Sequence, residues 1–227
     1  MLVSKIIENV RWCIDEEDSN PSSLAYVSVL GSDSALMDNI IKAKIPDALR
    51  WICLYAPSEL MSSTGDAPVS GTIDLIVEET LPPSHNLLTP SQTLLKVVRV
   101  KGSNWHRAIL GDSLLKEDSD EYLQLRDTNG AEATNDRPQA ALINTKQKKV
   151  EVWPTSNNQF TLTYAKALSN SDMQALTTIT TNVNIPVLVE TSFIYYLAYL
   201  VLSAYGDPRR EIMMEIAMQN IGKGQKQ

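Results

Sequence analysis

The apolar stretch at residues 185–205 constrains the fold of this chain more than any other feature of its sequence. No charged residue lies between Glu190 and Asp207, and residues 193–202 are apolar or aromatic without a break. A helix that is apolar on every side must be buried in protein or lie in a membrane. The uncharged run is shorter than the roughly 20 residues that span a bilayer, and its tyrosine hydroxyls need polar partners. We therefore expect it to be the central core helix of a soluble domain.

Proline and glycine mark the ends of this helix and the start of the next one. Pro186 suits a first helical turn, and Gly206 suits the position just after a helix end. Asp207-Pro208 then combines a good N-cap with a good first helical residue. A last helix is therefore predicted to begin there and to end at Gly222.

The predicted last helix carries an apolar stripe and several methionines, which adapt to irregular grooves. This composition is typical of a helix that docks into a groove on another subunit. The candidate partner-binding residues are Pro208, Ile212, Met213, Ile216, Met218 and Ile221. We expect the segment to be an assembly arm whose removal leaves the monomer folded. The alternative is one more helix that closes the monomer's core.

The sequence pattern of the first sixty residues predicts helices. Apolar residues recur at three- and four-residue spacing over residues 1–15, which is typical of an amphipathic helix. A second helical region covers residues 32–57 and contains Pro46, which predicts either two helices or one kinked helix. Trp51 and Tyr55 lie one turn apart in this region and are expected in the core.

Between the helical ends, the pattern changes to one typical of β-strands. The predicted strands are residues 72–79, 94–100, 122–126, 140–143, 149–153 and 160–164, and residues 105–115 are compatible with a strand or a short helix. Residues 154–158 fit a hairpin loop between the last two strands, and a short helix is expected at 171–176. The sequence thus predicts an α+β fold. Residues 1–63 and 165–227 would form a helical core, and residues 64–164 a β-rich insertion.

Composition narrows the classes of function. The chain has 227 residues, a net charge of −7 and a pI near 4.9, which argues against a general binder of nucleic acid or anionic membranes. Charged residues interrupt the start of the chain, so no signal peptide is expected. Cys13 and Cys53 lie in apolar helical patterns and are expected to be reduced, buried thiols.

No arrangement of residues predicts a catalytic centre, a cofactor or a metal site. The two histidines, His85 and His106, do not lie near other ligands at the spacing that zinc requires. Glu78-Glu79 could form a carboxylate pair for acid–base chemistry, but an exposed strand end explains the pair better. A solvated hairpin explains the basic cluster at residues 146–149 better than a phosphate contact does.

Two halves of the sequence carry a pattern larger than any single motif. The first reads ENVRWCIDEEDSNP and then LMDNIIKAKIPDALRWI; the second reads KKVEVWPTSNNQFTLTYAKAL and then IPVLVETSFIYYLAYLVLSAYGDPRREI. Together they resemble the opening and closing halves of phage head-to-tail adaptor (connector) proteins. The matching positions of the closing half are Trp153-Pro154, Tyr164, Tyr195-Tyr196, Tyr199 and Gly206-Asp207. The resemblance covers over half of the chain, and residues 64–139 depart from it.

The resemblance implies a virion structural protein of a tailed bacteriophage, made in the host bacterial cytoplasm and placed at the head–tail junction. Such adaptors form a homo-oligomeric ring, commonly a dodecamer, below the portal protein. They extend the DNA channel and dock the tail proteins. DNA would pass through the channel without specific binding, and no membrane and no cofactor would be involved. The acidic composition agrees with such a channel.

Other classes of protein stay open at this point. The chain could be a different tail or baseplate component, because the physical requirements are similar and only the partner differs. It could also be a soluble enzyme whose site is assembled from scattered residues such as Glu78 and His106. A regulatory or small-molecule-binding module is the remaining alternative.

Overall fold

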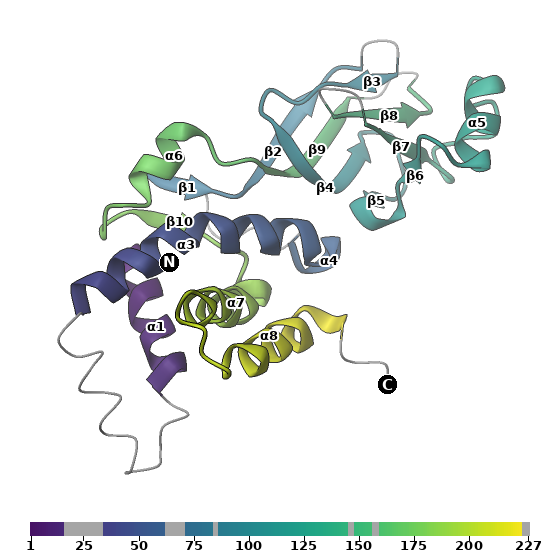
Figure 1. The fold of residues 1–227 in the computed structure, drawn as a ribbon. Coiled ribbons are helices and arrows are strands. Elements are labelled where there is room, and N and C mark those ends of the chain that lie inside the picture. Colours follow the sequence, from purple (N-terminus) through teal and green to yellow (C-terminus); the bar gives the residue numbers. More distant parts are fainter. Residues whose placement is uncertain (16–33, 62–70, 84–85, 145–147, 156–158, 224–227) are drawn as a thin grey trace. The chain divides into compact units, whose positions relative to one another are not determined.

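The computed structural model describes residues 1–15, 34–61, 71–83, 86–144, 148–155 and 159–223 (Figure 1). These residues form a mixed α+β protein, and the chain divides into two compact units. Unit 1 comprises Met1–Ala56, Ser63–Leu75 and Leu168–Gln227; unit 2 comprises Pro57–Ser62 and Ile76–Ala167. This division differs from the predicted one at its boundaries. Residues 64–75, predicted in the β-rich insertion, belong to unit 1. Residues 57–62 and 165–167, predicted in the helical core, belong to unit 2.

Unit 1 is built mainly from helices. Their bounds are α1 Val3–Asp15, α3 Ser34–Tyr55, α6 Asn170–Ala175, α7 Val187–Tyr205 and α8 Arg210–Met218, with a π-helical turn at Gln219–Lys223 after α8. Helices α1, α3 and α8 all pack against α7. The prediction that residues 185–205 form the central helix is therefore confirmed within this unit.

Helix α7 is not buried on every side, although its sequence is apolar throughout. Its buried residues are Val189, Ser192, Phe193, Ile194, Leu197, Ala198, Val201 and Leu202. Val187 and Leu188 are 70% and 56% exposed and Tyr205 is 46% exposed, so the expectation of all-round burial is wrong for both ends of the helix. Among the described residues, α7 is the helix whose length and composition would allow it to cross a membrane. Its buried face packs against three other helices of unit 1.

The ends of α7 follow the predicted signals closely. Pro186 occupies the N-cap, one position before the first helical residue, rather than the first turn itself. Gly206 ends the helix in the left-handed conformation, with φ 68°, and its N–H bonds to the carbonyl groups of Leu202 and Ser203. A side chain at this position would strain the backbone, which is why glycine is favoured there.

Helix α3 runs through Pro46 as one helix, which decides between the two alternatives that the sequence left open. Its buried side chains include Ile41, Ile45, Leu49 and Ile52, which recur at helical spacing and form the face that packs in unit 1.

A two-stranded parallel ladder completes unit 1. Strand β1, Thr72–Asp74, pairs with β10, Asn182–Asn184, and Leu2 bridges to Asn182 on the other side of β10. The predicted single strand at residues 72–79 is therefore wrong: it is interrupted at Leu75, and the strand that follows, β2 Ile76–Leu81, belongs to unit 2. The helix predicted at residues 171–176 is confirmed as α6, whose Ser169 and Asp172 form a capping box.

Unit 2 contains two four-stranded sheets, of strand order β2-β9-β4-β5 and β3-β8-β7-β6. The first holds β2 Ile76–Leu81, β9 Phe160–Lys166, β4 Leu94–Gly102 and β5 Ile109–Leu110. The second holds β3 Leu87–Leu88, β8 Lys149–Trp153, β7 Gln139–Ile143 and β6 Leu115–Lys116. The predicted strands at 94–100, 140–143, 149–153 and 160–164 are confirmed.

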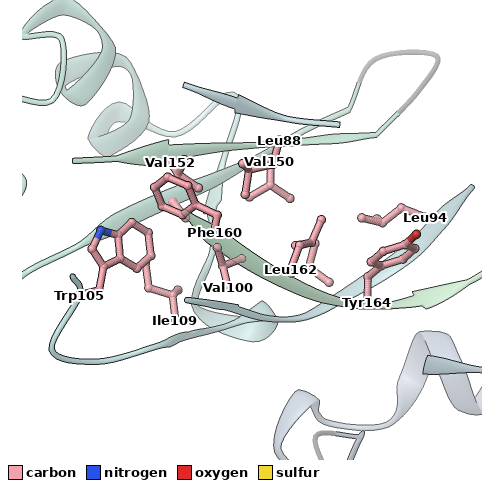
Figure 2. Close-up of a cluster of buried hydrophobic side chains, with 12 residues drawn as sticks. Leu88, Leu94, Val100, Trp105, Ile109, Val150, Val152, Phe160, Leu162 and Tyr164 are labelled. Atoms are coloured by element: carbon pink, nitrogen blue, oxygen red, sulfur yellow. The ribbon is translucent and has the colours of Figure 1, made fainter. Parts of the chain in front are cut away.

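Both sheets contribute side chains to one hydrophobic core (Figure 2). Phe160, Leu162 and Tyr164 alternate along β9 and are fully buried, while Val150 and Val152 enter the same core from β8. The rings of Trp105 and Phe160 meet edge to face with centroids 5.2 Å apart. This core explains why β9 shows the clearest alternation in the sequence.

Two predictions in the middle of the chain are wrong. Residues 122–126 lie in a helix, α5 Asp120–Asp127, because Ser119 caps it and the backbone N–H of Tyr122 bonds to the Ser119 hydroxyl at 3.2 Å. Strands β8 and β9 do not form a hairpin, because they belong to different sheets and residues 154–158 connect the two. The Trp153-Pro154 peptide bond in this connection is cis.

The region 105–115, which the sequence left open, combines both alternatives. Strand β5 is followed by a single 3-10 turn, Gly111–Ser113, and then by β6. A short helix, α4 Ser58–Met61, also belongs to unit 2. The backbone N–H of Ser58 donates to the Asp112 carboxylate at 2.6 Å, and Lys96 pairs with the same carboxylate at 2.9 Å.

Candidate interaction surfaces

The residues predicted to bind a partner lie on α8 and directly beside its two ends, and they divide between the core and the surface. Met213 is 2% exposed and Ile221 is fully buried, whereas Ile212 is 45% exposed. Pro208 is exposed, and Ile216 and Met218 are half-buried. Because α8 packs directly against α7, the expectation that this segment stands apart from the monomer's core is wrong. The side of α8 that carries Ile212 remains accessible to a partner.

The start of α8 differs in detail from the prediction. The helix begins at Arg210, and the predicted N-cap Asp207 instead accepts hydrogen bonds from Arg209. The Arg209 guanidinium reaches the Asp207 carboxylate at 2.8 Å and also donates to the Ile14 carbonyl oxygen at the end of α1, at 3.1 Å. These hydrogen bonds from Arg209 hold the pKa of the Asp207 carboxyl below its ordinary value. Asp207 and Arg209 therefore connect the last two helices to the first.

The depressed pKa of Asp207 predicts a pH dependence of stability. Because the folded protein favours the charged carboxylate, this contribution is present above the ordinary pKa of 3.8 and is lost as the pH falls through the lower folded pKa. Arg209→Gln should lower the free energy of unfolding by about 1–3 kcal/mol at pH 7. The difference in unfolding free energy between this variant and the unaltered protein should become smaller as the pH is lowered to 3, which chemical denaturation at each pH measures.

Arg210→Gln is the matched control for this prediction. Arg210 lies next in the chain, and its partner Glu211 is 71% exposed, so the pair is screened by water. The control should change stability little at either pH. An equal loss for Arg209→Gln at pH 7 and pH 3 would show that the ion pair with Asp207 is not responsible.

A row of four aromatic side chains, which we call the aromatic row, joins α3 to α7. Trp51 stacks on Tyr196, with ring centroids 4.0 Å apart and ring planes 8° from parallel. Trp51 also stacks on Tyr55, and the centroids of these two rings are 5.7 Å apart. Tyr199 extends the row from Tyr196 at 5.5 Å. Trp51 is buried as predicted, but Tyr55 is 49% exposed, so the core expectation is wrong for that residue.

The aromatic row lies beside the carboxylate of Asp47, which acts electrostatically on Tyr196. Burial raises the pKa of Tyr196, and the neighbouring Tyr199, Asp47 and Tyr55 raise it further. Asp47 precedes Trp51 by four residues and Tyr55 by eight on α3, so the three share one helix face. The spacing of these three residues was visible in the sequence, but their stacking partner on α7 was not.

Tyr195 and Tyr196, which are adjacent in the sequence and match the adaptor pattern, have different neighbours. Tyr196 belongs to the aromatic row, whereas Tyr195 lines a groove of about 360 Å³ between α1 and α7. Trp12 and Cys13 line the same groove from α1, and Trp12 is 62% exposed. Cys13 is half-buried and Cys53 is buried, so the expectation of two buried thiols holds fully for Cys53 alone.

The paired glutamates of β2 have separate structural roles. Glu78 is exposed and lies 3.5 Å from Arg99. Glu79 is half-buried and accepts hydrogen bonds from Ser91 and, at 2.7 Å, from the hydroxyl of Tyr164. Burial acts to raise the pKa of the Glu79 carboxyl, but these hydrogen bonds hold it below its ordinary value. Both residues lie in the middle of β2 and not at its end, so the predicted strand end is wrong; the predicted exposure holds for Glu78 and is wrong for Glu79.

The remaining titratable candidates are dispersed. His106 is exposed and contacts the Asp136 carboxylate, whereas His85 lies outside the described residues. Lys148 donates to the Leu95 carbonyl oxygen at 2.8 Å, and Lys146 also lies outside them. Over the ranges that the structure describes, no group of three or more His, Cys, Asp or Glu residues could hold a metal ion.

A scan against models of known protein families and a search of curated proteins both found no match for this chain. The interaction surfaces described above are therefore the basis on which a function can be argued.

Proposed function

We propose that this protein is a virion structural component of a tailed bacteriophage, a head-to-tail adaptor. It forms a ring below the portal, extends the DNA channel and docks the tail. In this proposal the helices contributed by both ends of the chain are the adaptor core. Unit 2 is the β-rich insertion, and it contacts other virion proteins.

The observation that carries the proposal is the packing of α1 and α3 against α7 within unit 1. The opening and closing segments that resemble adaptor proteins lie far apart in the sequence, and an adaptor core needs them together. The left-handed Gly206 and the anchored Asp207 give a structural reason for two of the positions in that resemblance.

Exposed apolar residues of unit 1 support a role in assembly. Trp12, Val187 and Leu188 are each more than half exposed, and exposed large apolar side chains are typical of protein interaction sites. The net charge of −7 supports a channel that DNA traverses without being held.

Two measurements on the full-length protein test this proposal. Light scattering and electron microscopy should find a closed ring whose mass is a multiple of 25.2 kDa, either alone or after addition of the portal protein. Antibody labelling should place the protein at the head–tail junction of the phage particles. A protein that stays monomeric with the portal and is absent from virions would contradict the proposal. A label elsewhere on the tail would instead identify another tail or baseplate component.

A further inference from the structure

The aromatic row carries chemical features that packing between α3 and α7 does not require. Three of its four rings are tyrosines, and Tyr55 at its end is half exposed. Within the described part of the chain, the hydroxyls of Tyr196 and Tyr199 make no hydrogen bond and Asp47 forms no ion pair. Lys44 and Arg50 lie three residues to either side of Asp47 on α3, yet neither pairs with it there. The surface thus combines aromatic faces, phenolic oxygens and one carboxylate.

We infer that the aromatic row together with Asp47 is a docking site for an arginine side chain of a partner protein. A guanidinium group is planar, so it can stack on an exposed tyrosine ring, and its five N–H donors can reach several oxygens at once. The Asp47 carboxylate supplies the opposite charge. The rings of Tyr196 and Tyr199 lie 5.5 Å apart, and Asp47 shares the face of α3 that carries Trp51 and Tyr55, so the carboxylate and the rings belong to one surface.

Charge complementarity decides between arginine and other occupants. An acidic side chain would be repelled by Asp47 and by the negative face of each ring. An apolar side chain would remove water from the Asp47 carboxylate without offering it a partner, which is unfavourable. A lysine would satisfy the charge, but its compact ammonium cannot both stack on a ring and bridge several acceptors. This inference does not depend on the adaptor function, because any protein partner could supply the arginine.

Nuclear magnetic resonance of the full-length protein with ¹³C-labelled tyrosine rings tests the inference. The probe is Nα-acetyl-arginine amide, and Nα-acetyl-citrulline amide is the matched control because it has nearly the same shape without the charge. Arginine amide should cause saturable shifts concentrated on Tyr55, Tyr196 and Tyr199, assigned through single Tyr→Phe variants. Citrulline amide should bind at least about tenfold more weakly. Equal binding of the two probes, or shifts spread over all eight tyrosines, would overturn the inference.

A pair of charge-removing variants tests the role of the carboxylate. Asp47→Asn should weaken binding of arginine amide by about three- to tenfold while circular dichroism stays unchanged, because Asp47 is exposed. Glu8→Gln is the control: it removes a carboxylate of unit 1 that is 55% exposed and pairs with Lys5 on the surface. The control should bind the probe as the unaltered protein does. Unchanged affinity in Asp47→Asn would show that Asp47 is not part of the site.

Discussion

A chain that ends at Gly206 should lose much of the stability of unit 1, instead of folding normally without its last helix. The truncation removes the buried side chains of Met213 and Ile221 and exposes the surface of α7 that they cover. Each large buried side chain contributes about 1.5–3 kcal/mol, which is a substantial part of the roughly 5–15 kcal/mol of a typical domain. Circular dichroism should show a broad transition at a much lower temperature. An unchanged melting curve would show that α8 is dispensable to the core.

Two neighbouring residues of α8 separate the core side of this helix from its accessible side. Met213→Ala should lower the free energy of unfolding by about 2–5 kcal/mol, because the residue is 2% exposed and truncation leaves a cavity. Ile212→Ala should change it by no more than about 0.5 kcal/mol, since Ile212 is 45% exposed. Chemical denaturation of both variants measures the difference. Similar losses at the two positions would contradict the packing of α8 described above.

Gly111→Ala should destabilise unit 2 by about 3 kcal/mol or more. A Cβ atom added at Gly111 would lie 1.7 Å from the Val97 carbonyl oxygen of β4, and backbone cannot move aside as a flexible side chain can. The strand or the 3-10 turn would have to shift, which would disturb the hydrogen bond between Ser58 and Asp112. Because Trp105 and Trp153 are buried in unit 2, tryptophan fluorescence during denaturation should report the change, read against variants in which Trp12 and Trp51 of unit 1 are replaced by Phe.

Ser113→Ala is the matched control for Gly111→Ala. Ser113 lies in the same 3-10 turn and is exposed, so a smaller side chain there meets no steric barrier. It should leave the unfolding transition within about 0.5 kcal/mol of that of the unaltered protein. A Gly111→Ala protein that unfolds like the control would contradict the close approach of the turn to β4.

Local signals in the sequence predicted most helices and strands of this protein. The stop at Gly206 is as predicted and Pro186 lies one position from its predicted place, because glycine and proline act through their own backbone geometry, independently of distant residues. The alternation along β9 was equally clear, since both sheets of unit 2 bury its apolar face. Helix α5 differs from the predicted strand because the Ser119 cap and the acidic first turn stabilise a helix, although tyrosine and leucine alternate there as in a strand.

The sequence by itself determined the long helices near both ends of the chain, the alternation along β9, and that α7 must be covered by other parts of the chain. The tertiary structure alone decided what covers it, because the apolar stripe of α8 suits a partner's groove and the monomer's own core equally well. It also assigned β8 and β9 to separate sheets and brought Trp51 against Tyr196. Such pairings join residues that are far apart in the sequence, and they depend on how whole surfaces fit together. Local sequence patterns therefore do not predict them.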